Sequence, residues 1–399
     1  MSTHTSTDAS GAVVIPTGFD PASYTTVRSL GRRGVTTIVG SEHQNVPAAG
    51  SRYCDEFVLL PSPYDDLVAY KDALVALAKR DEVRTIVPIR PHDAYVLSKY
   101  ADEFAPHVSI PVPEPKILAR AHDRVQLAQA ATEAGVPFPE TCLLDEFEPR
   151  SDRGSIVKSR YNVLTGTYLP DLAPEASAVV KLVHHLAPGE RPDRHAVVAE
   201  MGHVPIVQAF VPTDEKLMFA ALYDHGRAVA TFQHRQIRGN SYTGGGGVYR
   251  RSMFCPELER VARQLLDHLE WHGLACIEYI LDAETGEYKP IEINPRMWQS
   301  LPSTVRAGAD FPYYYWLQAT GRVDEIDAGY ELNRGSHLLY GEVGHLLSVL
   351  REDSPLVERP AFRDRAREVL ASCYAEPEFD YLKLDDPRPF LRGLRQVLG

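Results

Sequence analysis

Two carboxylates face each other in a predicted β-hairpin. Two apolar stretches flank the turn Asp282–Glu287, in which Gly286 suits the positive φ of a tight hairpin loop. If Thr285 is the centre of this turn, residue i pairs with residue 570 − i. Glu278 then lies directly opposite Glu292.

The facing acids need a positive charge between them. Side chains alternate along a strand, so Asn294 shares the face of Glu292, whereas Ile291 and Ile293 point to the other face. Opposed side chains have Cβ atoms roughly 4.5–5.5 Å apart, and two carboxylates at that distance repel each other on an apolar sheet. Two carboxylates and an amide oxygen suit Mg²⁺ bound together with a substrate phosphate. The alternative interpretation is a solvated antiparallel sheet with acids on its outer face.

The second strand of the hairpin ends in an amide and a guanidinium, Asn294 and Arg296, on either side of Pro295. Such a set can hold a metal, a phosphate and an anionic substrate together. The segment IEINPR at 291–296 resembles the signature of the ATP-grasp superfamily. The resemblance extends over roughly residues 115–321 and is closest to the carboxylate–amine ligases.

This resemblance implies ATP and Mg²⁺ (or Mn²⁺) as cofactors and assigns the hairpin residues their roles. Glu278, Glu292 and Asn294 are the expected metal ligands. Arg296 is expected to bind the substrate carboxylate or the acyl phosphate.

Three further cations match positions that contact phosphate in the resembled family. Lys158 ends a short strand and is expected at the α-phosphate, although a lysine at a strand end is commonly a surface edge residue. Arg124 stands where the family has a lysine, and a guanidinium can still bind phosphate with two donors. An ion pair with Asp123 at the start of a helix is its alternative. Arg238 matches a cation near the γ-phosphate.

The stretch 205–212 resembles the strand that holds adenine through its main chain. We therefore expect the base near Gln208, Ala209 and Val211. Glu215 matches the acid that binds the ribose hydroxyls, with Asp214 as the competing choice.

Four glycines at 244–247 follow a strand with cationic and titratable side chains. Their backbone N–H groups could converge on an anion, and a bare glycine run is also typical of a flexible loop. We expect a movable cover over the phosphates and the acceptor that excludes water. The glycine-rich loop that the resembled family has directly after Lys158 is absent, because 159–169 contains only Gly166.

The surrounding elements alternate between strands and helices at the start of the chain and become strand-rich later. Strands are expected at 12–16, 35–39 and 85–89, with helices at 21–33 and 64–80. The order predicts a small Rossmann-like unit, although no GxGxxG follows the first strand. Further elements are expected as helices at 117–134 and 255–272 and strands at 155–158, 178–181, 205–211, 217–223 and 228–232.

The fold expected is therefore α/β: a small Rossmann-like domain followed by a two-lobed ATP-grasp region with antiparallel sheets. The predicted division is a disordered tail at 1–10, the first domain at 11–113, the ATP-grasp domain at 114–321 with a small lobe at about 150–212, and a helical C-terminal extension at 322–399.

Composition excludes several classes of protein. The chain has 399 residues, 44% hydrophobic and 24% charged, as in ordinary globular proteins. A net charge of −12 argues against a nucleic-acid partner. Five scattered cysteines and the lack of a signal peptide favour a cytoplasmic protein with reduced thiols. No apolar run is long enough to span a membrane.

Taken together, the sequence predicts an ATP-dependent ligase that joins a small carboxylate to an amine through an acyl phosphate. The substrates are expected to be amino acids, and a homodimer is compatible with the sequence. Two alternatives stay open: a bicarbonate-activating enzyme of the carboxylase type, and a non-catalytic ATP-binding regulatory protein.

Overall fold

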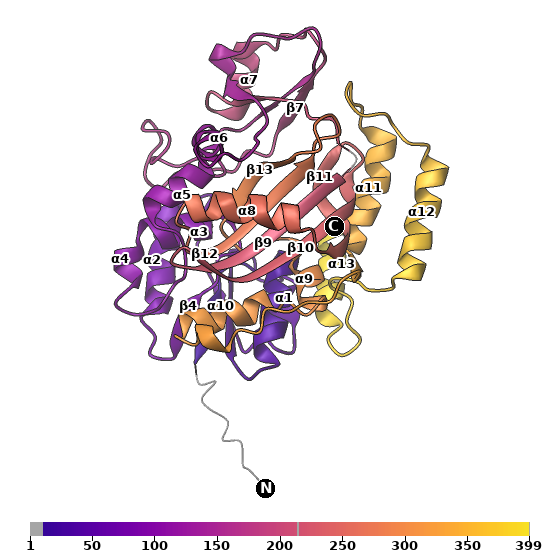
Figure 1. The fold of residues 1–399 in the computed structure, drawn as a ribbon. Helices are drawn as coiled ribbons and strands as arrows, with labels where there is room; N and C mark the ends of the chain where they lie inside the picture. The colour runs from indigo at the N-terminus through magenta and orange to yellow at the C-terminus, as the bar shows by residue number, and fades with distance from the viewer. Residues whose placement is uncertain (1–10, 214, 399) are drawn as a thin grey trace.

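The computed structural model describes residues 11–213 and 215–398. The tail at 1–10, predicted to be disordered, and Asp214, the competing ribose-binding acid, lie outside the described residues. Three sheets with helices on their faces make up the described chain (Figure 1). The α/β architecture is confirmed, with one parallel sheet followed by two antiparallel sheets.

The first sheet is parallel, with the strand order β3-β2-β1-β4. Its strands are β1 (Ala12–Ile15), β2 (Thr36–Ser41), β3 (Glu56–Leu59) and β4 (Val83–Ile86). The helices here are α1 (Pro21–Gly31), α2 (Leu67–Ala78), α3 (Pro91–Lys99) and α4 (Ala101–Phe104), with the 3₁₀ turn η1 (Ala48–Gly50). Val13 and Ile15 belong to one core and Ala12 and Val14 to another, so both faces of the sheet are covered.

Two short helices replace the single helix predicted at 117–134. Helices α5 (Pro115–His122) and α6 (Arg124–Glu133) meet at Asp123, whose backbone is extended (φ −95°, ψ 109°). The Asp123 carboxylate accepts two hydrogen bonds from the Arg160 guanidinium, at 2.9 and 2.7 Å, and also caps α6. This contact with a distant residue stabilises the break, which a local helix pattern does not contain.

The second sheet is small and antiparallel, with the order β5-β8-β6-β7. Its elements are β5 (Thr141–Leu143), η2 (Leu144–Glu146), β6 (Ser155–Lys158), β7 (Val183–Leu186), α7 (Arg194–Met201) and β8 (Ile206–Ala209). The strand predicted at 178–181 does not form; Ala178 makes an isolated bridge to Leu164, and β7 follows instead. With α7, this sheet forms the lobe at the top of Figure 1.

The third sheet has the order β13-β12-β9-β10-β11-β14 and lies at the centre of the molecule (Figure 1). Its strands are β9 (Glu215–Asp224), β10 (Arg227–Ser241), β11 (Gly244–Met253), β12 (Gly273–Leu281), β13 (Tyr288–Asn294) and β14 (Gly335–His337). Alternate side chains of β9 enter different cores. Phe219 packs in the core under α8 (Pro256–His268), and Met218 packs in the core shared with α1.

The remaining helices come from the last hundred residues. They are α9 (Leu301–Arg306), α10 (Phe311–Ala319), η3 (Val323–Glu325), α11 (Leu339–Arg351), α12 (Phe362–Ala375) and α13 (Arg388–Leu398). The segment predicted as a helical extension thus also supplies β14, which pairs with β11. A fully buried ion pair, Arg250–Asp380 at 2.9 Å, attaches this segment to the central sheet.

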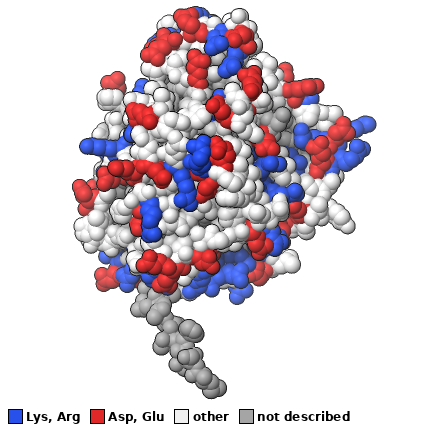
Figure 2. Space-filling model, viewed as in Figure 1, with Lys and Arg blue, Asp and Glu red and all other residues white. Residues whose placement is uncertain are grey.

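Charged side chains of both signs are interspersed over the face of the molecule shown in Figure 2. None of the helices in the described ranges has the length and apolar character that a membrane span requires.

Candidate active site

A cleft of about 920 Å³ opens where the three sheets meet. The parallel sheet contributes the loops after its strands, the small sheet contributes the end of β6, and the central sheet contributes β11, β12 and β13. Six of the eleven predicted site residues line the cleft: Arg124, Lys158, Glu278, Glu292, Asn294 and Arg296. The structure therefore brings together the predicted metal ligands and three of the four predicted cations.

The register of the β12–β13 hairpin confirms the predicted pair. Glu278 is opposite Glu292, and Gly286 in the turn has φ +73°. Nearer the turn the predicted register is wrong by one residue, because Tyr279 pairs with Pro290 and leaves Ile291 as an extra residue. The prediction that Ile291 points away from the acids is therefore wrong, and Ile291 lines the cleft with them.

Glu292 is held by two neighbours. Its carboxylate accepts a hydrogen bond from the Arg124 guanidinium at 2.6 Å and another from the Asn294 side-chain amide at 2.8 Å. Burial would raise its pKa, but Arg124, Asn294 and Lys158 outweigh burial and lower the pKa. Glu292 is therefore a carboxylate at neutral pH.

The pKa of Glu278 is shifted in the opposite direction from that of Glu292. Its side chain is exposed to the cleft and is surrounded by protein on its other sides. Loss of water and repulsion by Glu292 raise the pKa of Glu278 to about 7, against the attraction of Arg296, Lys216 and Lys158. No salt bridge within 4.0 Å engages Glu278 among the residues that the structure describes. Its carboxylate is therefore available to a cation from solution.

Two basic side chains, Lys158 and Arg124, lie close to these acids. Burial, together with the nearby Arg124 charge, lowers the pKa of Lys158 to about 7, while Glu292 and Glu278 favour its charged form. Arg124 does not form the ion pair with Asp123 that was its alternative assignment, because Asp123 pairs with Arg160. The Lys158 and Arg124 side chains both line the cleft, Arg124 as a cation and Lys158 with a positive charge that the two acids favour.

Sequence reasoning missed Lys216 on β9. Burial lowers its pKa, and Glu278 is the acid that favours its charged form. Strand β9 pairs with β12 so that Met218 is opposite Glu278, which places Lys216 on the same face two residues away. The sequence shows that Lys216 and Met218 lie on the same face of a strand, but it does not show that this strand pairs with β12.

The donor set at the hairpin fits a hard divalent cation. Two carboxylates and an amide converge on one face, and Glu278 lacks a charged partner in direct contact among the described residues. The Asn294 side chain already bridges the set, because its amide donates to Glu292 while its oxygen accepts from Arg296 at 3.2 Å.

Arg296 and Arg238 have different surroundings. Arg296 lines the cleft and donates only to neutral oxygens, those of Met297 and Asn294, among its recorded partners. Arg238 does not line the cleft: it is buried and donates two hydrogen bonds to Glu342, at 2.7 and 3.1 Å, and one to Ser372 at 2.7 Å. The acid on α11 thus draws Arg238 away from the position expected for a phosphate contact.

The residues predicted to hold adenine and ribose lie beside the cleft and not in its lining. Gln208 is buried and donates to Thr141 at 2.9 Å, and the Ala209 N–H donates to the Glu140 carbonyl. Val211 is buried in the connection between β8 and β9, and Glu215 forms an ion pair with Arg235 at 3.0 Å. Their roles stay predictions.

The glycine run is not a loop. Gly244 to Gly247 begin β11, and Gly247 pairs with Gly239 of β10. Pairing with β10 fixes a segment that was expected to be flexible. Gly245 and Gly246 nevertheless line the cleft, so the tip of this hairpin borders the site as expected.

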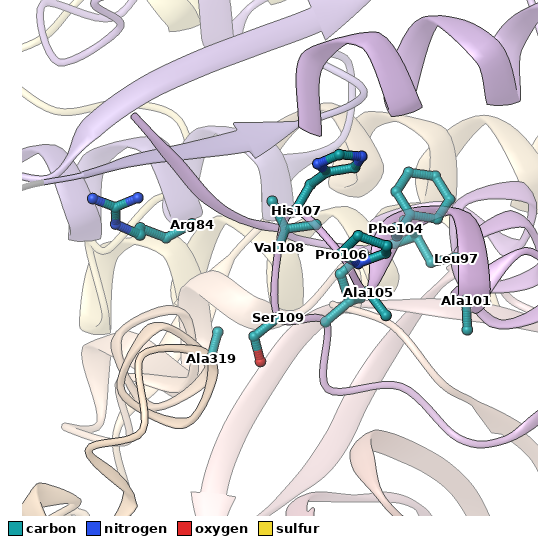
Figure 3. Close-up of a pocket in the computed structure, with 11 residues that line it drawn as sticks. Arg84, Leu97, Ala101, Phe104, Ala105, Pro106, His107, Val108, Ser109 and Ala319 are labelled. Atoms are coloured by element: carbon teal, nitrogen blue, oxygen red, sulfur yellow. The ribbon is translucent and has the colours of Figure 1, made fainter. Parts of the chain in front are cut away.

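A second hollow of about 560 Å³ lies beside α4, away from the facing acids. Figure 3 shows Pro106 and Val108 between Arg84 on one side and Phe104 and Leu97 on the other. Its lining contains no carboxylate, so it offers no comparable ligand set for a metal.

No family model and no curated protein matches the chain. Solved structures do. Carboxyaminoimidazole ribonucleotide synthase from Aspergillus clavatus, complexed with ATP, is 15% identical with a TM-score of 0.59, and the match covers 82% of this chain and 81% of that one.

Two more enzymes are equally similar. The biotin carboxylase domain of Hydrogenobacter thermophilus 2-oxoglutarate carboxylase, with MgADP and bicarbonate, is 14% identical with a TM-score of 0.59, over 81% of this chain and 73% of that one. The L-amino acid ligase from Bacillus licheniformis is 15% identical with a TM-score of 0.58, over 82% and 79%. These neighbours are ATP-grasp enzymes. The chain therefore has the ATP-grasp fold.

Proposed function

We propose that the protein is an ATP-dependent ligase that joins a carboxylate to an amine and releases ADP and phosphate. One observation carries the proposal: Glu278 and Glu292 face each other in a cleft that also contains Lys158, Arg124 and Arg296. The cleft thus combines an oxygen ligand set for a metal with cations for phosphate and for an anionic substrate.

A carboxylate does not react with an amine unaided, because its oxygen is a poor leaving group. In the proposed reaction, a carboxylate oxygen attacks the γ-phosphorus of ATP, and ADP leaves. The amine then attacks the carbonyl carbon of the acyl phosphate, the carbon–oxygen bond to phosphate breaks, and the amine loses a proton as the amide forms.

The residues of the cleft divide this work. Arg296 would hold the substrate carboxylate, since it has no carboxylate partner among its recorded contacts. Lys158 and Arg124 would bind the phosphates. Glu278, Glu292 and Asn294 would hold Mg²⁺, which neutralises charge on the phosphates when bound. Arrival of metal and nucleotide would exchange the Arg124–Glu292 ion pair for contacts to phosphate and metal.

We keep the base-binding and ribose-binding assignments as part of the proposal. The connection from β8 to β9 joins the small sheet to the central sheet, and Ala209 and Val211 lie at its start. An adenine ring beside this main chain would need little of the side chains. Gln208 would flank the base, and Glu215 would bind the ribose.

The test is a screen for ADP release with amino acids, singly and in pairs, with mass detection of products. We expect one pair to release ADP and to form an amide, and hydroxylamine to trap the acyl phosphate as a hydroxamate. ATP binding without phosphate release across the whole panel would contradict the proposal and favour a regulatory protein.

Activation of bicarbonate is the second candidate. The observation that favours it is the equal similarity to the carboxylase domain with bound bicarbonate, at a TM-score of 0.59 against 0.58 for the amino acid ligase. A bicarbonate arm in the same screen separates the two, because ADP release that depends on bicarbonate alone would assign the carboxylase type.

A further inference from the structure

Three aromatic side chains lie near one another in the lining of the cleft. Phe19 comes from the loop after β1, whereas Tyr340 and Tyr381 come from the C-terminal segment, defined here as residues 338–393. Leu338 and Gly393 of the same segment line the cleft with them. We call these five residues the aromatic end.

The C-terminal segment is fixed to the loops of the parallel sheet that carry the aromatic end. The Tyr381 hydroxyl donates to the Phe19 carbonyl at 2.8 Å. Asp386 accepts from the Ser51 hydroxyl at 2.6 Å and from a backbone N–H at 3.0 Å. Arg392 donates to the Val46 carbonyl at 3.2 Å. This wall of the cleft is therefore part of the folded site.

Phe19 and Tyr340 expose apolar ring surface at this end, whereas Tyr381 is buried. The Tyr340 hydroxyl donates to the Phe390 carbonyl at 2.6 Å, and the two rings stack with centroids 5.6 Å apart. The Tyr340 ring also lies 5.9 Å from that of Tyr381. Phe19 is 48% exposed, which is unusual for phenylalanine unless another group covers it.

The positions of the other groups show which part of a substrate reaches this end. Lys158, at the end of β6, is opposite Ile206 of β8, and Ala209 lies at the far end of that pair of strands. A nucleotide with its phosphates at Lys158 and its base near Ala209 would extend along β8, none of whose residues lines the cleft with the aromatic end. Arg296, which follows β13 and lines the same cleft as the aromatic end, remains as the cation for a substrate carboxylate.

We infer that the aromatic end binds a large apolar or aromatic substituent of the carboxylate substrate, and that Tyr340 sets the size of that substituent. The inference rests on the proposed ligase function, because it needs Arg296 to hold the substrate carboxylate. Helix α13 packs closely against the Tyr340 ring, because a Cβ at Gly393 would lie 3.0 Å from the Tyr340 hydroxyl. This close packing fixes the ring that is assigned to limit the size of the substituent.

Binding measurements test this inference without turnover. Protein loaded with Mg²⁺ and a non-hydrolysable ATP analogue is titrated calorimetrically with glycine and L-phenylalanine, and with acetate and 3-phenylpropanoate. We expect the phenyl compound of each pair to bind about tenfold tighter or more. Phe19→Ala and Tyr340→Ala should each reduce that preference about tenfold, and Tyr340→Phe should keep it because the ring remains.

Tyr374→Ala is the matched control, because Tyr374 belongs to the same segment but is 90% exposed on α12. If Tyr340→Ala does not fold, Phe19→Ala still tests the inference, because Phe19 is half exposed and its removal should leave the fold intact. Equal binding within both pairs by the wild type, or an unchanged preference in both alanine variants, would overturn the inference.

Turnover separates this inference from the proposed function. A preference for phenyl compounds without ADP release from any carboxylate would contradict the ligase and leave the aromatic end as a binding site. Carboxylate-dependent ADP release without any preference for apolar substituents would contradict the aromatic end alone.

Discussion

Glu278 and Glu292 occupy one sheet face and have opposite pKa shifts. Arg124 and Asn294 hold Glu292 as a carboxylate, whereas desolvation and the charge of Glu292 raise the pKa of Glu278 to about 7. The pair therefore carries one proton, on Glu278, below about pH 7 and loses it as the pH rises above 7. A metal that binds here displaces that proton, which links metal affinity to pH.

The raised pKa of Glu278 should make the effect of Glu278→Gln on the stability of the metal-free protein depend on pH. The folded-state pKa of about 7 lies above the ordinary value of 4.5, so the stability from binding this proton is present below pH 4.5 and is lost as pH rises through 7. Glutamine cannot ionise. We expect the variant to melt about 2 °C above the wild type at pH 8 and to match it at pH 4.5.

Thermal unfolding at both pH values measures this difference. Glu287→Gln is the control, because Glu287 is an exposed acid in the turn of the same hairpin. A shift of equal size at pH 4.5 and pH 8 would show that Glu278 is an ordinary glutamate.

At the scale of elements, α11 is attached to β10 through a buried ion pair. Arg238 and Glu342 are both buried, and Glu342 also accepts from His337 at 2.8 Å. Removal of one member of a buried pair leaves the other charge without a partner and costs about 3–5 kcal/mol.

Arg238→Met and Glu342→Leu should each lower the free energy of unfolding by about 3 kcal/mol in urea denaturation. The double variant should lose less than the sum, because no buried charge is left alone. If Arg238→Met instead keeps full stability but loses ADP release, then Arg238 acts on phosphate, as the sequence predicted, and this structural role is wrong.

The turn and strand pattern of the sequence predicted the hairpin. The features that were not predicted depend on contacts between residues far apart in the sequence. The turn at 282–287 brings the two strands together, but in the register next to the turn Leu281 pairs with Tyr288, and the extra residue Ile291 then brings Glu278 opposite Glu292. The break at Asp123 depends on Arg160, and the position of Arg238 depends on Glu342, more than a hundred residues away in sequence.

The residues of the candidate site likewise divide into those that a local motif predicts and those that depend on distant pairing. Its acids were predictable because the hairpin carries a local motif. Lys216 and Tyr340 were not, because only the pairing of β9 with β12 places Lys216 near Glu278, and only the return of the C-terminal segment brings Tyr340 to the cleft.

At the scale of the whole molecule, the cleft exists only when all three sheets and the C-terminal segment assemble. Its walls come from residues as far apart in the sequence as Thr17 and Gly393. A ligand in the cleft can therefore contact all three sheets and the C-terminal segment, and it should stabilise the whole molecule by mass action.

Mg²⁺ with ATP should raise the melting temperature, since a ligand at a hundred times its dissociation constant adds about 2.7 kcal/mol to the free energy of unfolding. ATP with EDTA should give a much smaller rise, because the facing acids then lack the metal that bridges them to phosphate. An equal rise with and without Mg²⁺ in differential scanning fluorimetry would argue against metal-dependent binding.

The most direct test of the central claim is Mn²⁺ binding, measured by electron paramagnetic resonance in the presence of a non-hydrolysable ATP analogue. The wild type should bind Mn²⁺ tightly, and Glu292→Gln should bind it about 100-fold more weakly, with an unchanged far-ultraviolet circular dichroism spectrum. Undiminished Mn²⁺ affinity in the folded Glu292→Gln variant would contradict the claim that these facing carboxylates form a metal site.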